Sequence, residues 1–213
     1  MHIVSVNTAI ATNLDIGNKT VSTGIFKEPR QGGAMISALG VEGDTIVDTS
    51  VHGGEDQAVY LYSAADYQWW SELLGRELSP GMFGENLTVS AFPQRPLRIG
   101  DRLLINGSVH LEITAPRVPC VKFATKMGDP TFVKKFVAAE RPGAYARVLS
   151  PGRVSAGDTV SWQLTDNDYA TVNEVFVEWH RKDWSVAVFQ KAVNSPISKI
   201  ARAIIEERYL KGR

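Results

Sequence analysis

The chain has 213 residues, of which 44% are hydrophobic and 22% charged, as in an ordinary globular protein. Its 23 acidic and 23 basic residues balance, so net charge does not support a nucleic-acid partner, and no stretch is apolar for long enough to span a membrane. A single cysteine excludes an intrachain disulfide and a four-cysteine iron–sulfur cluster. The N-terminal residues lack the pattern of a secretory signal, so we expect a cytoplasmic protein.

The first half of the chain has the pattern of short strands separated by turns. Alternating and β-branched residues predict strands at residues 2–6 and 58–62. A helix should follow the second strand, because Ser63 can cap it and Asp66, three residues later, completes a capping-box pattern. Gly75 is the expected end of this helix.

The middle of the chain has the pattern of a β-sheet. Strands are predicted at residues 85–89, 102–105, 109–114, 144–149 and 159–164. The pair Asn106-Gly107 signals a hairpin, and apolar residues on one face predict a short helix at residues 130–140. Many short strands with few helices indicate a closed or nearly closed β-barrel, so the predicted fold class is mainly β with α.

From about residue 166 the pattern becomes helical. Three helices are predicted from their caps: from Thr171 and Glu174 to about residue 179, from Asp183 to about residue 193, and from Ser195-Pro196 to about residue 210. We therefore predict a β-barrel domain at residues 1–165 and a small three-helix domain at residues 166–213.

Several common functional motifs are absent from the sequence. There is no G-x-x-x-x-G-K-[ST] phosphate loop, no G-x-G-x-x-G dinucleotide motif and no G-x-S-x-G serine elbow. The four histidines lie far apart and show no zinc-binding spacing. The remaining candidates are three polar loops at strand ends.

The first loop, residues 51–59, contains His52, Gly53, Gly54 and Asp56. Paired glycines let the backbone approach a ligand closely and can expose N–H groups to an anion. His52 and Asp56 add a hydrogen-bond donor and an acceptor. A surface turn with solvated polar residues would have the same composition.

The second loop, residues 81–88, contains Phe83, Gly84, Glu85 and Asn86. Glu85 and Asn86 lie at the mouth of a predicted strand, where a carboxylate beside an amide could read the edge of a heterocycle by hydrogen bonding. The alternative is a turn in which both side chains satisfy nearby backbone groups.

The third loop, residues 114–122, breaks a strand with two prolines, and Cys120 directly follows the second of them. Arg117 and Lys122 flank this cysteine. Nearby positive charge lowers the pKa of a thiol toward the thiolate that binds metals, whereas a lone cysteine is otherwise a small buried hydrophobe. Cys120 is therefore the candidate chemical centre.

These loops, in this order, resemble the MOSC superfamily, the molybdenum-cofactor sulfurase C-terminal domain. The resemblance rests on Val51-His52-Gly53-Gly54 with Asp56 and Ala58, Phe83-Gly84-Glu85-Asn86-Leu87, Ile99-Gly100-Asp101, Pro116-Arg117-Val118-Pro119-Cys120, and Gly143-Ala144-Tyr145-Ala146-Arg147-Val148 followed by Val154-Ser155-Ala156-Gly157-Asp158. The helical tail is similar to that of the YiiM-like branch, so the resemblance covers nearly the whole chain.

The resemblance implies a MOSC-type β-barrel, a three-helix C-terminal domain and a molybdenum–pterin cofactor. Cys120 would be the catalytic residue and the molybdenum ligand, a role that suits a soft thiolate. One of three basic residues would bind the cofactor phosphate, and Asp56 or Glu85 would relay protons. The residues implied to bind the cofactor are His52, Gly53, Gly54, Asp56, Phe83, Gly84, Glu85, Asn86, Arg117, Lys122 and Arg147.

The YiiM-like branch is associated with reduction of N-hydroxylated compounds, such as 6-hydroxylaminopurine, to amines. The chain has no flavin or nicotinamide fingerprint, so the resemblance implies electrons from a separate reductase, a flavoprotein. A homodimer is compatible with the sequence. Two other functions stay open: a carrier of the cofactor or of persulfide sulfur on Cys120, and a ligand-binding barrel without chemistry.

Overall fold

The computed structural model describes residues 1–47, 53–181 and 184–211 of the chain. Its strands are β1 (Ile3–Thr8), β2 (Thr12–Ile16), β3 (Lys19–Thr23), β4 (Glu28–Pro29), β5 (Ala34–Ser37), β6 (Gly40–Val41), β7 (Val59–Ser63), β8 (Leu87–Val89), β9 (Arg102–Ile105), β10 (Val109–Ala115), β11 (Ala144–Ser150), β12 (Gly152–Val154) and β13 (Val160–Gln163). Its helices are the 3-10 helix η1 (Glu55–Gln57), α1 (Ala64–Leu74), α2 (Val121–Met127), α3 (Phe132–Ala139), α4 (Val172–Trp179), α5 (Val186–Val193) and α6 (Lys199–Lys211).

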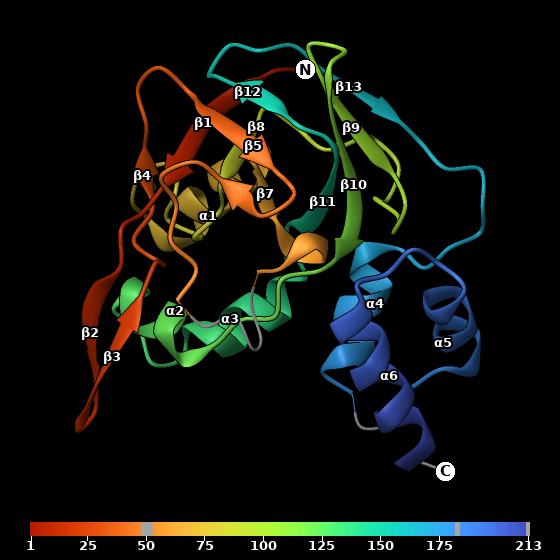
Figure 1. Ribbon diagram of the computed structural model, residues 1–213. Coiled ribbons are helices and arrows are strands. Elements are labelled where there is room, and N and C mark those ends of the chain that lie inside the picture. Colours follow the sequence, from red (N-terminus) through yellow and green to blue (C-terminus); the bar gives the residue numbers. More distant parts are fainter. Residues whose placement is uncertain (48–52, 182–183, 212–213) are drawn as a thin grey trace.

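An eight-stranded mixed sheet in the order β13-β9-β10-β11-β7-β8-β1-β4 forms the centre of the molecule (Figure 1). Its neighbours pair antiparallel except β7 and β8, which are parallel. A small sheet, β12-β5-β6, and the hairpin β2-β3 lie outside it. Figure 1 shows α4, α5 and α6 grouped below β9 and β10. The fold is therefore mixed α/β.

The large sheet is open, and no closed barrel forms within the described residues, so the prediction of a closed or nearly closed barrel in a mainly β fold is confirmed only in part. Near the start of β1, however, backbone hydrogen bonds join the two sides of the sheet. The Ile3 N–H donates to the Asp158 carbonyl over 2.9 Å, and the Val160 N–H donates to the Met1 carbonyl over 2.8 Å. This seam brings β13 against the N-terminal end of β1 without a continuous ladder.

Local capping signals predicted two helices correctly. The Ser63 hydroxyl accepts from the Asp66 N–H over 3.0 Å at the start of α1, and Gly75 ends that helix. Thr171 and Glu174 form a complete capping box at the start of α4. Each signal lies within four residues of the helix end, so it acts independently of the rest of the fold.

The third tail helix starts later than predicted. α6 begins at Lys199, and Pro196 lies before it rather than in its first turn. The Ser195 hydroxyl donates to the Ala192 carbonyl over 2.6 Å, so it closes α5 instead of opening α6. Ser198 takes the capping role, because its hydroxyl accepts from the Ala201 N–H over 3.1 Å. The predicted cap Asp183 lies outside the described residues.

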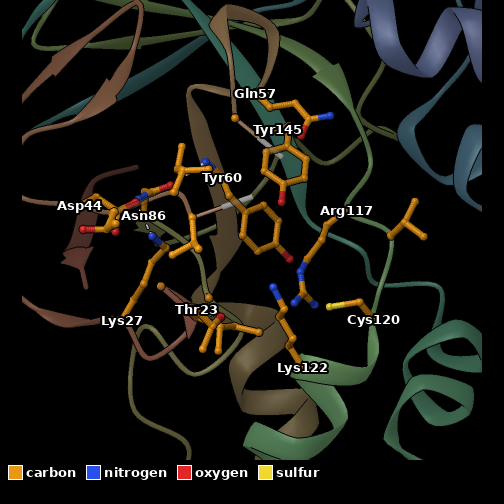
Figure 2. Close-up of a pocket in the computed structure, with 18 residues that line it drawn as sticks. Thr23, Lys27, Asp44, Gln57, Tyr60, Asn86, Arg117, Cys120, Lys122 and Tyr145 are labelled. Atoms are coloured by element: carbon orange, nitrogen blue, oxygen red, sulfur yellow. Dashed lines mark hydrogen bonds and ion pairs between the residues drawn. The ribbon is translucent and has the colours of Figure 1, made fainter. Parts of the chain in front are cut away.

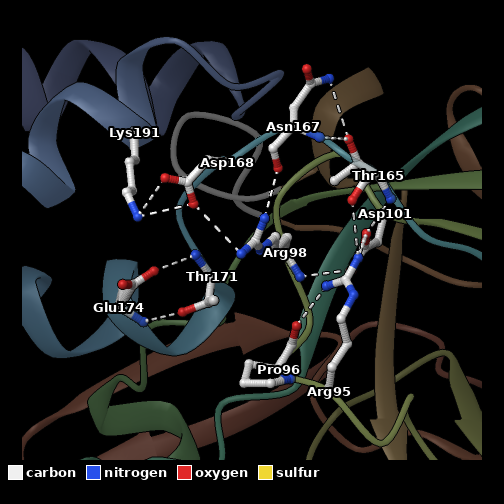
Figure 3. A network of polar contacts seen from close by, with 10 residues as sticks. All are labelled: Arg95, Pro96, Arg98, Asp101, Thr165, Asn167, Asp168, Thr171, Glu174 and Lys191. Atoms are coloured by element: carbon white, nitrogen blue, oxygen red, sulfur yellow. Dashed lines mark hydrogen bonds and ion pairs between the residues drawn. The ribbon is translucent and has the colours of Figure 1, made fainter.

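A buried carboxylate fixes the connection between the sheet and the helices (Figure 3). Asp101 is fully buried, and its Oδ1 accepts from Arg95 Nη2 over 2.7 Å and from the Thr165 N–H over 2.8 Å. Its Oδ2 accepts from the Arg98 N–H over 2.8 Å, and the Arg98 guanidinium lies 3.5 Å from Asp168. Three donors thus converge on one side chain.

One hydrophobic core continues from the sheet into the helical tail. Val175 of α4, Ala192 of α5 and Ile205 of α6 are fully buried in the same cluster as Leu111 of β10. A division into domains at residue 165 stays a prediction, because the two parts share this core. None of the helices in the described segments is long and apolar enough to cross a membrane.

Candidate functional site

A cavity opens where the loop after β3, strands β7 and β11 and the start of α2 meet (Figure 2). Six residues that the sequence marked as site candidates line it: Gly53, Gly84, Asn86, Arg117, Cys120 and Lys122. They come from all three of the loops singled out above. The fold therefore brings together segments that lie far apart in the sequence.

Cys120 is half-buried and lines this cavity. β10 ends at Ala115, and the proline-containing loop then leads to α2, with Cys120 as its N-cap residue. Figure 2 shows the sulfur pointing toward the guanidinium of Arg117. In the described part of the chain, no group of three or more His, Cys, Asp or Glu side chains could hold a metal ion. A metal at Cys120 would therefore need a cofactor that brings further ligands.

Arg117 is the most unusual residue of the cavity. Its side chain is buried, and its guanidinium carbon lies 4.0 Å from the centroid of the Phe123 ring. Among the described residues it makes no ion pair, and its Nη1 has no hydrogen-bond partner. A buried cation with an unmet donor is costly unless an anion compensates it. The site therefore suits a negatively charged ligand.

Other charged side chains in the cavity add to its suitability for a negatively charged ligand. Lys27 forms an ion pair with Asp44, and Lys122 adds a further ammonium group without an acidic partner among the described ion pairs. The lining formed by the described residues thus has three cations and one carboxylate, an excess of positive charge. Burial lowers the pKa of Lys27, and the charge of Asp44 only partly opposes this shift.

Two glycines let the backbone form the cavity wall. Gly53 and Gly84 both have a φ of +77°, in the left-handed region that favours glycine. A Cβ at Gly53 would lie 2.9 Å from the side chain of Ile46, and a Cβ at Gly84 would lie 3.3 Å from that of Ile25. A larger residue at either position would crowd the wall.

Two tyrosines also line the cavity: Tyr60, which is buried, and Tyr145, which is half-buried. Burial raises the pKa of both hydroxyls, and the charge of Arg117 only partly opposes this effect. The hydroxyls are therefore protonated near neutral pH. The Tyr60 hydroxyl donates a hydrogen bond to the Pro142 carbonyl over 2.8 Å, so its proton is not available to a ligand in the cavity.

Glu85 and Asn86 make hydrogen bonds mainly to other groups of the protein. Asn86 lines the cavity, but its Oδ1 accepts from the Tyr60 N–H over 3.1 Å and its Nδ2 donates to Asp44 over 2.9 Å. Glu85 is fully buried outside the lining, and its Oε1 accepts from the Tyr67 hydroxyl and the Gly81 N–H, both over 2.7 Å. Glu85 thus supports the loop that carries Gly84. This favours the alternative in which Glu85 and Asn86 satisfy nearby groups of the protein and do not read a ligand.

Four other candidates lie away from the cavity lining. Phe83 is buried in an aromatic cluster, with its ring 4.4 Å from that of Tyr62, and Gly54 is exposed. Asp56 and Arg147 pair with each other at 2.9 Å. His52 falls outside the described residues.

The sequence offered little sign of five further lining residues, namely Lys27, Asp44, Gln57, Tyr60 and Tyr145. Gln57, Tyr60 and Tyr145 lie in segments already singled out, but strand periodicity alone does not show which faces the cavity. Lys27 and Asp44 carry no motif and reach the site through the loops after β3 and β6.

Replacing Arg117 with methionine should separate binding from stability. We expect Arg117→Met to leave the free energy of unfolding of the empty protein unchanged or raise it by about 1 kcal/mol, because an unpaired buried charge is removed. The same change should weaken the binding of inorganic phosphate by about tenfold or more. Urea denaturation and titration calorimetry would measure the two effects.

Arg147→Met is the matched control for Arg117→Met. Its guanidinium pairs with Asp56 at 2.9 Å and with Glu112 at 3.4 Å, so its loss should cost about 2 kcal/mol of stability and leave phosphate binding unchanged. Equal destabilisation by the two variants would contradict the conclusion that the Arg117 charge does not stabilise the empty protein.

Lys126, which is hydrogen-bonded to the lining residue Ile25, should make stability depend on pH. Its Nζ donates to the carbonyls of Ile25 over 2.8 Å and Gly81 over 2.6 Å, and burial lowers its pKa from 10.5 to about 8. Between these values the unfolded chain binds more protons, so stability rises with pH. From pH 7 to 9.5 the wild type should gain about 2 kcal/mol relative to Lys126→Met. Urea denaturation across this range tests the prediction, and a constant difference would contradict it.

Comparison with known proteins gives a family match. Residues 48–161 match the MOSC domain. The chain is 39% identical over 155 residues to protein YflK of Bacillus subtilis (strain 168), covering 73% of this chain and 70% of that protein. It is 26% identical over 160 residues to YiiM of Escherichia coli (strain K12), covering 73% and 70%.

A longer relative and a solved structure extend these matches. The chain is 33% identical over 144 residues to a protein named reductase from Gibberella moniliformis (strain M3125 / FGSC 7600), covering 66% of this chain but 26% of that protein. The crystal structure of YiiM from Geobacillus stearothermophilus superposes with a TM-score of 0.79 at 24% identity and covers 98% of each chain. This likeness shows that the fold is shared over nearly the full length.

Proposed function

Because the chain belongs to the MOSC domain family and is YiiM-like, we propose that it is a molybdenum-cofactor-dependent reductase of N-hydroxylated compounds. The MOSC family is associated with this cofactor, and one distant relative is named a reductase. The observation that supports the proposal most directly is the buried guanidinium of Arg117 beside the Cys120 sulfur. This guanidinium makes no ion pair with the described residues, and its Nη1 has no hydrogen-bond partner among them.

The cavity residues fit a cofactor that is anionic and binds metal through sulfur. The Cys120 thiolate would be the protein's ligand to molybdenum, a soft donor for that metal. Arg117 and Lys122 would bind the phosphate, Arg117 through the Nη1 that has no partner among the described residues. Gly53 and Gly84 would keep the wall of the cavity in shape, because a Cβ at either position would crowd Ile46 or Ile25. When bound, the cofactor supplies two-electron chemistry at an oxygen atom.

The proposed overall reaction is a two-electron reduction. The N–O bond of a hydroxylamino or amidoxime group breaks, so that a hydroxylamino compound becomes an amine or an amidoxime becomes an amidine, and the oxygen leaves as water. Two protons and two electrons are consumed. The electrons would come from a separate reductase, which we expect to be a flavoprotein.

The residues around Cys120 would orient the substrate and hold a proton. Tyr145 lines the cavity with Cys120, and burial raises the pKa of its hydroxyl, so the proton is present near neutral pH. Tyr145 can therefore donate a hydrogen bond to a departing oxygen. Asp56 and Glu85 are less suited to relay protons, because Asp56 pairs with Arg147 and Glu85 is buried behind the lining.

Metal analysis combined with turnover tests the proposal. Protein made in a host that synthesises the cofactor should contain molybdenum and release a fluorescent pterin on oxidation. With a chemical electron donor it should convert amidoximes to amidines, or hydroxylaminopurines to aminopurines, over many turnovers. A clean preparation with neither molybdenum nor pterin would overturn the proposal.

A carrier role is the second candidate. Cys120 is half-buried at a cavity rather than enclosed, so an acceptor could approach its sulfur. A carrier would release the cofactor or a persulfide sulfur atom once to an acceptor protein and would not turn over N-hydroxylated compounds. Multiple turnovers in the experiment above would exclude a role as carrier alone.

A further inference from the structure

A second cavity meets Cys120 from the side of the helical tail. Gln57, Val118, Cys120 and Tyr145 line both cavities. The rest of the second cavity is apolar and is formed by Ala115, Pro116, Pro119, Trp179, Ile200, Ala201 and Ile204. Cys120 therefore lies at the junction of a basic cavity and an apolar one.

We propose that this apolar cavity binds the ring of the substrate, and that Trp179, Ile200 and Ile204 select substrates whose N-hydroxylated group is attached to a flat, uncharged ring. This inference rests on the proposed function. It assigns the helical tail a direct part in substrate recognition. The basic cavity would hold the cofactor, and the N-hydroxylated group would lie at the junction beside Cys120.

The cavity wall comes from two helices of the tail. Ile200, Ala201 and Ile204 share one face of α6 at helical spacing, and Trp179 is the last residue of α4. Ile200 is 38% exposed, although it is a large aliphatic residue at the start of a helix that packs on the core. An apolar ring in this cavity would remove such surface from water.

Trp179 is held in place by Arg208. The guanidinium carbon of Arg208 lies 4.8 Å from the indole centroid, and its Nη1 donates to the Trp179 carbonyl over 2.9 Å. A fixed indole presents a flat apolar surface without an ordering cost when a ligand binds. This geometry favours a planar ring over a flexible chain.

The two cavities differ in charge, as expected if the first binds an anionic cofactor and the second a neutral ring. Lys27, Arg117 and Lys122 line the first cavity, whereas the second cavity is lined by no charged side chain of the described residues. An anionic cofactor would favour the first cavity, and a neutral ring would favour the second.

Gln57 offers one polar contact at the junction. Its Oε1 is buried and has no hydrogen-bond partner in the described segments. A buried amide oxygen gains stability when it accepts a hydrogen bond. The N–H of a hydroxylamino or amino substituent would supply that donor and orient the edge of the ring.

The first turn of α6 is anchored to the elements around Cys120. Asp56 Oδ2 accepts from the Lys199 N–H over 2.8 Å, and its Oδ1 pairs with Arg147 at 2.9 Å. Arg147 Nη2 also donates to the Pro196 carbonyl over 2.8 Å. Asp56 and Arg147, which lie outside the first cavity, thus act as positioning residues for Ile200.

A pair of substrates that differ mainly in the ring tests the inference. Benzamidoxime and acetamidoxime carry the same N-hydroxylated group on a phenyl ring and on a methyl group. We expect the wild type to have a kcat/KM for benzamidoxime about tenfold or more above that for acetamidoxime. Ile200→Asn should lower this ratio about tenfold while the molybdenum content stays at the wild-type level.

Leu210→Asn is the matched control for Ile200→Asn. Leu210 lies on the same helix, is 73% exposed and lines neither cavity, so the ratio should be retained. Because Ile200 is already partly exposed, the folded state should tolerate asparagine there. An unchanged ratio in Ile200→Asn would overturn the inference.

Binding without turnover separates this inference from the proposed function. Protein without cofactor, carrying labelled isoleucine methyl groups, would be titrated with benzamide and with acetamide and followed by NMR. Benzamide should shift the methyl resonances of Ile200 and Ile204, and acetamide should shift them far less. If neither amidoxime is reduced but benzamide shifts these resonances, the proposed function fails and the apolar ring site stands. If benzamide leaves them unshifted, the ring site is wrong.

Discussion

Cys120→Ser should lose molybdenum and reductase activity together. Serine keeps the shape of the side chain but replaces a soft thiolate with a hard, protonated hydroxyl, which binds the metal poorly. Purified from a cofactor-producing host, the variant should retain less than about a tenth of the wild-type molybdenum, the effect expected for loss of a direct ligand. Metal analysis and pterin fluorescence would measure the loss without any activity assay.

The neighbouring residue provides the control for this prediction. Val121 begins α2, is 55% exposed and is not among the residues that line the cavity. Val121→Ser should retain both molybdenum and activity, so a loss in Cys120→Ser alone would be due to the sulfur. A Cys120→Ser protein that keeps its molybdenum would show that the thiolate is not the metal ligand.

Asp101→Ala should give the largest loss of stability among the changes considered. The carboxylate is fully buried and accepts hydrogen bonds from Arg95, from the Arg98 N–H and from the Thr165 N–H. Alanine would leave these donors without their acceptor and the Arg95 guanidinium without its ion-pair partner. We expect the free energy of unfolding to fall by about 3–5 kcal/mol, as measured by urea denaturation.

Asp168 offers a matched control from the same network (Figure 3). It pairs with Arg98 at 3.5 Å and with Lys191 at 2.9 Å, but its side chain is 68% exposed. Water compensates most of such a loss, so Asp168→Ala should cost less than about 1 kcal/mol. Similar losses of stability in the two variants would mean that burial of the carboxylate does not determine how much each side chain stabilises the protein.

Elements with local signals could be predicted from the sequence, and elements stabilised by distant contacts could not. The caps at Ser63 and Thr171 act within one helical turn, so both helices were predicted closely. The hairpin β2-β3 and the short helix α2 were missed. The hairpin strands are mostly exposed, so they lack the alternation of buried and exposed residues that marks a strand.

In the candidate site, too, residues with local signals could be predicted and those defined by distant contacts could not. Cys120, Arg117 and Lys122 lie close together in one loop, and the sequence identified all three. It could not separate Arg117 from Arg147, because both are arginines in characteristic segments. The difference is in their partners: Arg147 meets carboxylates from η1 and β10, whereas Arg117 meets aromatic rings. Such partners depend on how distant strands pair.

The seam between residues 1–3 and 157–160 bears on the order in which the chain can fold during synthesis. β1 also pairs with β8, whose residues are made some 80 positions later. The first strand therefore leaves the ribosome long before β8 and β13, and of the strands that contact it only the two-residue strand β4 follows it early. Contacts across so much of the chain form slowly, because a long loop must close first. Completion of the sheet is thus a late event, coupled to the synthesis of β13 just before the helical tail.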